Sequence, residues 1–333
     1  SIYIKVLNDL KSASDQLIAN DETILGDVIY DGDKLKWRKL INSYYLRILM
    51  NLSKKENVAE LNIKNRFNEV FTNPSKYPIF ESNDDNGALH FYNIQDNRYP
   101  LQNNNDLQTA YYLEESFVER LQDFQDPRLF TFAEKKPNGN NLPDDDFNAY
   151  GGLYGSGDLN TNVSKAVNGE ASRVHPRYFN DPENEPSLLI SYAEVEFILA
   201  EATVRNWINS NAETHYKNGI QASLNFYNIS ETDAYLNNPK IELSTGNEIK
   251  AILTQKHIAM YLNTGWQSFF EQRRTGFPEF NTDGTGILNS GNIPKRWMYP
   301  ANEATNNGEN LNSAINRQFP NGDTINGEMW ILK

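Results

Sequence analysis

The chain has 333 residues, 38% of them hydrophobic and 12% aromatic, so Tyr, Phe and Trp have to supply much of the apolar core. Its formal net charge of −13 repels a phosphate backbone and argues against nucleic acid as a partner. The absence of cysteine excludes disulfides, thiolate metal sites and cysteine nucleophiles.

Three helices are predicted at the start of the chain. Apolar residues recur at helical spacing from Ile2 to Leu17, which indicates an amphipathic helix. A second helix is predicted over 35–52, where a broad apolar stripe indicates burial on more than one side, and a third over 56–71. No basic or apolar leader precedes the first helix, so we expect the chain to start within a longer protein.

Two long loop regions follow, over 72–110 and 131–186, separated by a short predicted helix at 111–122. Both regions are rich in Asn, Asp, Pro and Gly, yet they carry many aromatic rings, whereas a disordered linker would lack them. Connections of this length are commonly functional, so we expect the ligand to bind here.

The C-terminal part is predicted to be helical again. Two helices over 187–207 and 212–227 mix small and large residues, as in the close packing of a tetratricopeptide-like hairpin. Further helices are expected over 248–262 and 266–274, and Gly276 and Pro278 end the last one. The tail from residue 281 is rich in Asn and Gly.

Three stretches, in matching order and spacing, resemble the SusD/RagB family of outer-membrane nutrient-binding lipoproteins. The first is DVIYDGD at 27–33, with KWRK at 36–39 and NSYYLR at 42–47. The second is YAEVEFILAEA at 192–202. The third is QKHIAM at 255–260, followed by GWQSFFEQRRTGFP at 265–278 and RWMYPANE at 296–303.

This resemblance implies a single all-α domain over 1–333, with tetratricopeptide-like helical pairs in an α/α superhelical scaffold, long irregular loops and few short strands. It divides into N-terminal helices (1–71), a loop-rich ligand-facing region (72–186), and C-terminal helical pairs with the tail (187–333). It also implies a cell-surface protein of the outer membrane that acts as a lid on a SusC-like TonB-dependent transporter, without catalysis. The lipid-anchored Cys of the family and its first helices are absent from this chain, so membrane attachment rests on the resemblance.

Candidate ligand-binding residues come from the loops, because a sugar ring suits flat aromatic surfaces flanked by polar groups. Two clusters offer this mixture, and the predicted site is Tyr92, Asn93, Asp96, Arg98, Tyr99, Tyr150 and Tyr154. The competing interpretation is that these rings anchor the long loops to the helices.

Other polar residues fit chemical sites less well. Two of the carboxylates of Glu194, Glu196 and Glu201 could serve a hydrolase as acid and base, but a solvated or packing role is expected for them. Glu271, Arg273 and Arg274 are expected to pair with other helix charges. The four histidines are scattered and form no zinc motif, so no metal is predicted. Asp144, Asp146 and Asn148 alternate as Ca²⁺ ligands do, without the Gly and Glu that complete a calcium loop, so calcium stays open.

The leading functional hypothesis is capture of an oligosaccharide and its delivery to the transporter. A peptide ligand would use the same stacking and hydrogen bonds, so the loops do not exclude peptide capture. A glycoside hydrolase and a protein-binding helical adaptor are the alternatives from other classes.

Overall fold

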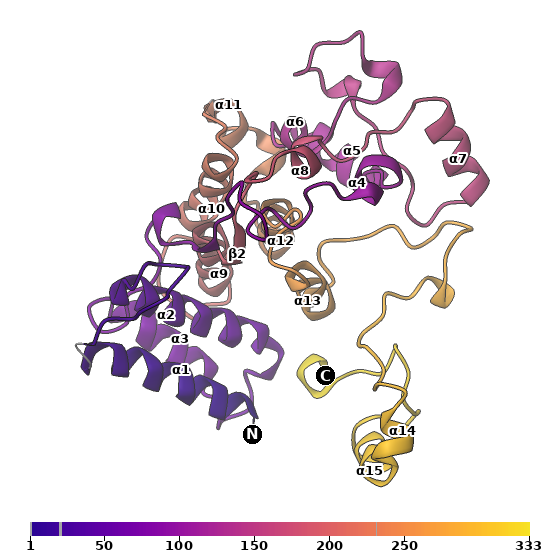
Figure 1. Cartoon of the computed structure of the whole chain (residues 1–333). Coiled ribbons are helices and arrows are strands. Elements are labelled where there is room, and N and C mark those ends of the chain that lie inside the picture. The colour runs from indigo at the N-terminus through magenta and orange to yellow at the C-terminus, as the bar shows by residue number, and fades with distance from the viewer. Residues whose placement is uncertain (1, 20–21, 231) are drawn as a thin grey trace.

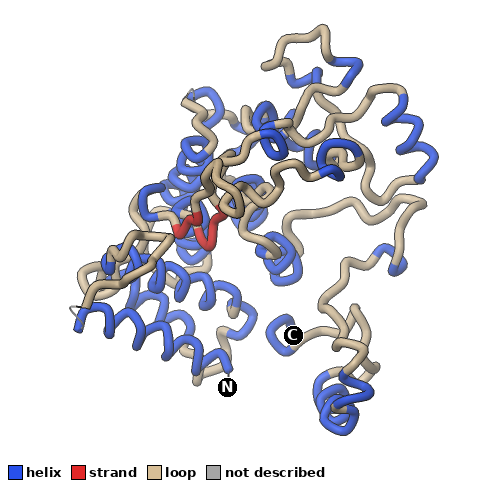
Figure 2. The backbone as a smooth tube through the Cα atoms, in the orientation of Figure 1, coloured by secondary structure: helices blue, strands red, loops and turns tan. Residues whose placement is uncertain are grey.

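The computed structural model describes residues 2–19, 22–230 and 232–333. Within these ranges the chain is built from helices and long loops, with one two-stranded sheet (Figures 1 and 2). The predicted helical fold with few strands is therefore confirmed. No described helix is both long enough and apolar enough to cross a membrane.

The N-terminal helices lie side by side at the lower left of Figure 1. They are α1 (Ile2–Ala19), α2 (Lys34–Asn51) and α3 (Ile63–Thr72), with the short 3-10 turn η1 (Ser53–Lys55) after α2. The side chain of Asp33 caps α2 by accepting from the Leu35 and Lys36 N–H groups at 2.8 and 3.0 Å. The third helix begins seven residues later than predicted, because Asn62 takes a left-handed conformation (φ 44°) and the residues before it form turns.

The loop-rich region contains short helices between its connections. They are α4 (Asn105–Thr109), α5 (Glu115–Phe124), α6 (Leu129–Phe132), α7 (Leu159–Val167) and α8 (Arg177–Asn180), with 3-10 turns η2 (Asn83–Asp85), η3 (Pro137–Gly139) and η4 (Phe147–Ala149). Helix α5 is the one predicted over 111–122, shifted toward the C-terminus. Helix α7 lies inside a predicted loop: Leu159, Val163 and Val167 recur at helical spacing, but all three are exposed and the helix has no buried residue.

The C-terminal part holds the central helices of the fold. They are α9 (Tyr192–Val204), α10 (Ala212–Phe226), α11 (Asp233–Leu236), α12 (Glu248–Ala259) and α13 (Gln267–Thr275), followed in the tail by α14 (Glu303–Asn306) and α15 (Gly308–Gln318), with 3-10 turns η5 (Pro239–Ile241), η6 (Asn289–Gly291) and η7 (Trp330–Leu332). Figure 1 shows α14 and α15 at the lower right, joined to the rest by long loops.

The helix predicted from residue 187 begins five residues later, because the first four residues form strand β2 (Ser187–Ile190). This strand pairs antiparallel with β1 (Gly87–Leu89), with a bulge between Gly87 and Ala88. The Ser191 side chain then caps α9 by accepting from the Glu194 N–H at 3.1 Å. The sheet thus ties the first loop region to the start of the central helix.

Helix α9 is the centre of the fold, since ten of its thirteen residues are buried. Val195, Ile198 and Leu199 join the core formed with α1, α2 and α3. Phe197 and Ala200 join a second core with α10 and α12. Its buried glutamates bind side chains of the neighbouring helices, so α9 is covered on all sides and separates the two cores.

Helix α10 packs closely on α9 because α10 carries a glycine at the contact. A Cβ built on Gly219 would lie 2.9 Å from the Phe197 ring, closer than real Cβ contacts allow. The mixture of small and large residues predicted for this pair therefore has a structural role at this position.

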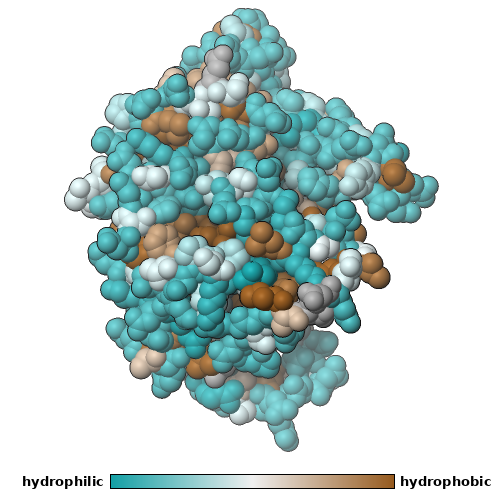
Figure 3. All heavy atoms as spheres, turned by 90° about the vertical axis from the view of Figure 1, so that its left-hand side faces the viewer, coloured by the Kyte–Doolittle hydropathy of each residue, from teal (hydrophilic) through white to brown (hydrophobic). Residues whose placement is uncertain are grey.

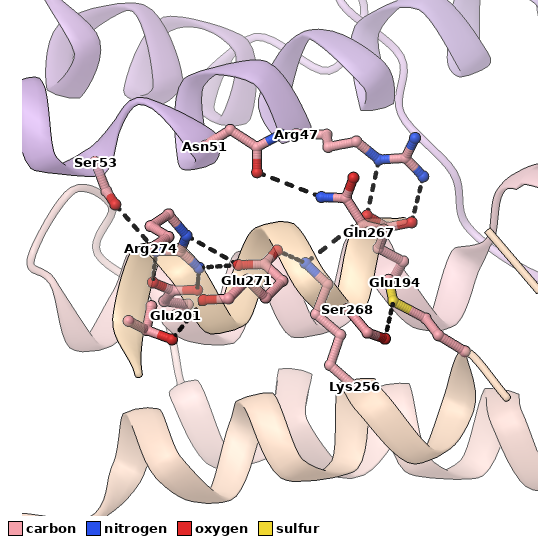
Figure 4. Close-up of polar contacts among 12 residues, drawn as sticks. Arg47, Asn51, Ser53, Glu194, Glu201, Lys256, Gln267, Ser268, Glu271 and Arg274 are labelled. Carbon is pink, nitrogen blue, oxygen red and sulfur yellow. Dashed lines mark hydrogen bonds and ion pairs between the residues drawn. The ribbon is translucent and has the colours of Figure 1, made fainter. Parts of the chain in front are cut away.

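A buried ionic network joins α2, α9, α12 and α13 (Figure 4). Arg47 of α2 binds Glu194 with two hydrogen bonds, and Lys256 donates to Glu271 at 2.6 Å. Arg274 contacts both Glu271 and Glu201 and donates to the Ser53 hydroxyl at 3.0 Å. The expected pairing of Glu271 and Arg274 with other helix charges is confirmed, whereas Glu194 and Glu201 form buried ion pairs where a solvated or packing role was expected.

Candidate ligand-binding site

The loop between α1 and α2 is organised by Asp27, the first residue of the first family-like stretch. Its carboxylate accepts from the Ile29 and Gly32 N–H groups, each at 2.9 Å, and from the Trp37 indole N–H at 2.6 Å. Burial raises the pKa of Asp27, but these hydrogen bonds outweigh it and hold the pKa below its usual value. Asp27 therefore remains charged and shapes the loop.

A second loop faces this one and is fixed to the helices. The Tyr30 hydroxyl donates to the Asp85 carbonyl at 2.7 Å, and Lys39 of α2 pairs with the Asp85 carboxylate at 2.9 Å. The Asn86 side chain accepts from the Tyr192 N–H at 2.7 Å, at the start of α9. These contacts hold residues 83–86 in place between α2 and α9.

The two loops enclose a cleft of about 1000 Å³, named here the Tyr92 cleft. The Tyr92 ring at its edge is 57% exposed and shares the lining with Asn97 and His90 of the same loop. Polar groups that face it include Asn86, Asp31, Asp84 and Lys36, and apolar surface comes from Val28, Leu89 and Phe226. Rings and apolar carbons among amides and charges are the surface predicted for a sugar ligand.

The side of the molecule at the left of Figure 1 has no continuous apolar surface in the view of Figure 3. Figure 3 shows this side as mostly hydrophilic, with apolar atoms gathered in separate patches near mid-height. Among the exposed apolar residues of the 24–33 loop, Leu25 is 87% and Val28 is 72% accessible.

The first predicted cluster lies in one turn beside the cleft. The Tyr92 N–H donates to the Asn97 carbonyl at 2.9 Å, and Asp96 has a left-handed φ of 70°. Asn93, Asp96 and Arg98 are exposed, and the Asn93 N–H donates to the Glu183 carboxylate at 3.0 Å. Of the cluster's predicted residues, the cleft is lined by Tyr92 alone.

Tyr99 has a different position from the rest of its cluster. Its ring is buried and packs edge-on against Phe91 at 5.6 Å, and its N–H donates to the Pro182 carbonyl at 2.7 Å. Burial and the nearby charge of Glu185 raise the pKa of Tyr99 to about 12. For Tyr99 the structure favours the anchoring interpretation, since a buried ring offers no face to a ligand.

The second predicted cluster lies outside the cleft. Tyr150 is buried against Phe130 at 5.5 Å and donates to the Asp144 carbonyl at 2.7 Å, so it too anchors its loop. Tyr154 is half-buried, and its hydroxyl donates to the Asp283 carboxylate. The structure does not bring these two residues together with Tyr92 in one pocket.

The alternating acids at 144–148 have local partners. The Asp146 carboxylate accepts from the Asn148 backbone and side-chain amides at 2.8 and 2.9 Å, which caps η4. Asp144 pairs with Lys135 at 2.7 Å. Within the described ranges, no group of three or more His, Cys, Asp or Glu residues could hold a metal ion.

The hydrolase alternative loses its candidate carboxylates. Glu194 and Glu201 are buried and bound to Arg47 and Arg274, and the Glu196 carboxylate accepts from His215 Nδ1 at 2.7 Å. None of the three lines the Tyr92 cleft. They hold helices together.

Sequence reasoning missed most of the cleft. Asp31, Val28, Asn86 and Phe226 come from three distant segments, and only the packing of α2, α9 and α10 brings them together. The aromatic and amide content of the 72–110 loop was the one signal that pointed here.

Residues 1–300 match the family model SusD-like_2, described as starch-binding and associating with the outer membrane. An outer-membrane protein of Bacteroides vulgatus, described in connection with nutrient binding, is 35% identical with a TM-score of 0.93 over 100% of this chain and 75% of its own. A SusD homologue of Bacteroides fragilis is 37% identical, with a TM-score of 0.91 and the same coverage. A structure described as a chitin-binding protein is 28% identical, with a TM-score of 0.84 over 100% of this chain and 72% of its own. No curated protein matches the chain.

Proposed function

The chain belongs to the SusD-like family of nutrient-binding outer-membrane proteins, and we propose that it captures an oligosaccharide in the Tyr92 cleft. The family consists of non-catalytic binding proteins, so capture is the whole task of the site. The observation that carries the proposal is the exposed Tyr92 ring at the edge of a cleft with polar walls.

The chemistry of the cleft suits a glycan. The face of a sugar ring is a flat array of C–H groups, which stacks on an exposed aromatic ring such as Tyr92. The hydroxyl groups at the sugar's edge donate to and accept from amides and carboxylates, which Asn86, Asn97 and Asp84 supply. A volume of about 1000 Å³ is at the upper end of small-molecule sites, so it accommodates several sugar units.

The similarity to a chitin-binding protein suggests which glycan to test first. Chitin is a polymer of N-acetylated amino sugars, whose acetamide groups hydrogen-bond with side-chain amides. At 28% identity over the whole chain, this relative makes chito-oligosaccharides the first glycan to test. Maltohexaose is the second, because of the family description.

Delivery to a SusC-like TonB-dependent transporter is part of the proposal. The family description places the chain at the outer membrane, where a captured oligosaccharide needs a transporter to enter. Co-purification of the chain with a SusC-like transporter tests this step separately from ligand binding.

Calorimetric titration of the purified chain with chitohexaose, maltohexaose and a mixed peptide of similar length tests the ligand class. We expect saturable binding of a glycan and about tenfold weaker binding by Tyr92→Ala, because a ring stacked on a sugar contributes about 1–1.5 kcal/mol. Ile94→Ala is the matched control: Ile94 is 61% exposed on the same loop but does not line the cleft.

Equal binding by Tyr92→Ala and the wild-type chain would refute the cleft as the site. Asn93, Asp96, Arg98 and Tyr154 would then be tested in turn, since they remain proposed ligand contacts outside the cleft. Saturable peptide binding without glycan binding would replace the oligosaccharide by a peptide.

A further inference from the structure

A second cavity, of about 420 Å³, lies between α5, the end of α12 and Phe280. It shares no lining residue with the Tyr92 cleft. We call it the Arg120 pocket, after the cation in its wall.

Six of the fourteen residues that line the Arg120 pocket carry an aromatic ring. Phe117 stacks on Tyr261 at 5.4 Å with an interplanar angle of 11°, and it meets His257 edge-on at 5.7 Å. His257 in turn meets Phe280 edge-on at 5.7 Å. Tyr111 and Phe280 are 55% and 39% exposed, so the rings at the mouth are open to a ligand.

Arg120 forms no ion pair in this pocket. Its guanidinium donates to the Glu279 carbonyl at 3.2 Å, and no carboxylate in the described part of the chain lies within ion-pairing distance of it. Glu114 lines the same pocket, and its carboxylate accepts from the Ser116 hydroxyl and the Phe117 N–H. Burial lowers the pKa of Arg120, and the charges of Glu114 and Glu279 offset this effect only in part.

His257 supplies a buried nitrogen atom, Nδ1, without a hydrogen-bond partner among the described residues. Burial and the charge of Arg120 lower the pKa of His257 to about 4, so the imidazole is neutral at pH 7 and can donate one N–H. Buried polar groups without partners are uncommon in proteins and call for an explanation.

The geometry points to a second binding site: the Arg120 pocket takes a flat ring that bears one carboxylate. The ring lies among Tyr111, Phe117 and Phe280, and the carboxylate accepts from the Arg120 guanidinium. Apolar walls favour a ligand that is mostly ring, and a cation whose burial is only partly offset by Glu114 and Glu279 favours an anion. A free aromatic acid and the C-terminal carboxylate of an aromatic residue share this chemistry.

Titration of the full chain with benzoate and with benzamide at pH 7 tests the site. The two probes have the same ring and nearly the same size, so they differ at Arg120 through charge alone. We expect benzoate to bind at least about tenfold more tightly than benzamide, because a charge-assisted hydrogen bond is about twice as strong as a neutral one. Binding should also shift the NMR signals of the His257 ring.

Two variants measure separately what the Arg120 charge and what the aromatic walls contribute to binding. Arg120→Gln should abolish the preference for benzoate, while Phe280→Ala should weaken both probes equally. Phe280→Ala also serves if Arg120→Gln fails to fold. Arg317→Gln is the control, since Arg317 is exposed on α15 and lines neither pocket. Oligosaccharide binding should be unchanged in Arg120→Gln. The proposal for the Arg120 pocket and the proposal for the Tyr92 cleft are therefore tested independently.

A comparison of N-acetylphenylalanine with its amide identifies the source of the carboxylate. Tighter binding of the acid than of benzoate assigns the pocket to a peptide end, and the reverse assigns it to a free aromatic acid. Equal binding of benzoate and benzamide, or unchanged His257 signals at saturation, would overturn the assignment.

Discussion

Replacement of Arg274 by Met should destabilise the fold strongly without changing the ligand sites. Arg274 is 4% exposed and neutralises two buried carboxylates, of Glu201 and Glu271. Removal of one partner from a buried ion pair costs about 3–5 kcal/mol, because it leaves the other charge uncompensated. Summed over 333 residues, an unfolding entropy of about 2.1 cal/mol/K per residue gives about 0.7 kcal/mol/K, so Tm should fall by about 4–7 °C.

The effect should depend on pH with a defined sign. Burial raises the pKa of Glu271, but Arg274 and Lys256 outweigh it and hold the pKa at about 2, below the ordinary 4.5. This depressed pKa stabilises the wild-type fold above pH 4.5, and the stabilisation is lost as the pH falls from 4.5 toward 2. In Arg274→Met, Glu271 keeps only Lys256 and Glu201 keeps only Arg205 as a cation, so both carboxylates protonate more readily and the difference between variant and wild type should shrink on acidification.

Thermal unfolding followed by circular dichroism at pH 7 and at pH 4 measures both effects. Lys217→Met is the control, because Lys217 pairs with Glu213 on the surface of α10, where such pairs contribute at most about 0.5 kcal/mol. Adding Glu201→Gln to Arg274→Met should recover part of the loss. A decrease in Tm below about 1 °C, or a decrease that is the same at both pH values, would refute the proposed role of the network.

Three further substitutions test single contacts. Tyr150→Phe removes the hydrogen bond to the Asp144 carbonyl and should cost about 1 kcal/mol in chemical denaturation without affecting glycan binding; a loss of binding would return Tyr150 to the site. Gly219→Ala places a Cβ 2.9 Å from the Phe197 ring and should cost about 1–3 kcal/mol by the same measurement, whereas a neutral result would show that α10 can move away from α9. Asp27→Ala removes the acceptor that shapes one wall of the Tyr92 cleft, so glycan affinity measured by calorimetry should fall while Tm changes little; unchanged affinity would show that the loop keeps its shape without it.

Helices α1, α2, α10 and α12 begin within one residue of their predicted starts. The errors occur where a local pattern had a non-local cause. Residues 187–190 continue an apolar run, yet they form β2 because β1 lies beside them.

The rings in the long loops show the limit of composition as a guide. Tyr92 and Tyr99 occur seven residues apart in similar surroundings, but one is 57% exposed and the other 6%. The loop turns at Asp96, and this turn decides which ring faces solvent and which enters the core. Periodicity does not report this choice, because an irregular loop has no period.

The sequence by itself determined the helical class of the protein, and its three ordered motifs determined the family. These properties depend on patterns that are local or that recur along the chain. Only the tertiary structure decided where a ligand could bind, because the walls of the Tyr92 cleft come from segments near residues 30, 85, 92 and 226. The packing of α2, α9 and α10 sets the distances between those segments. Because the segments are far apart in the chain, no local sequence pattern encodes these distances.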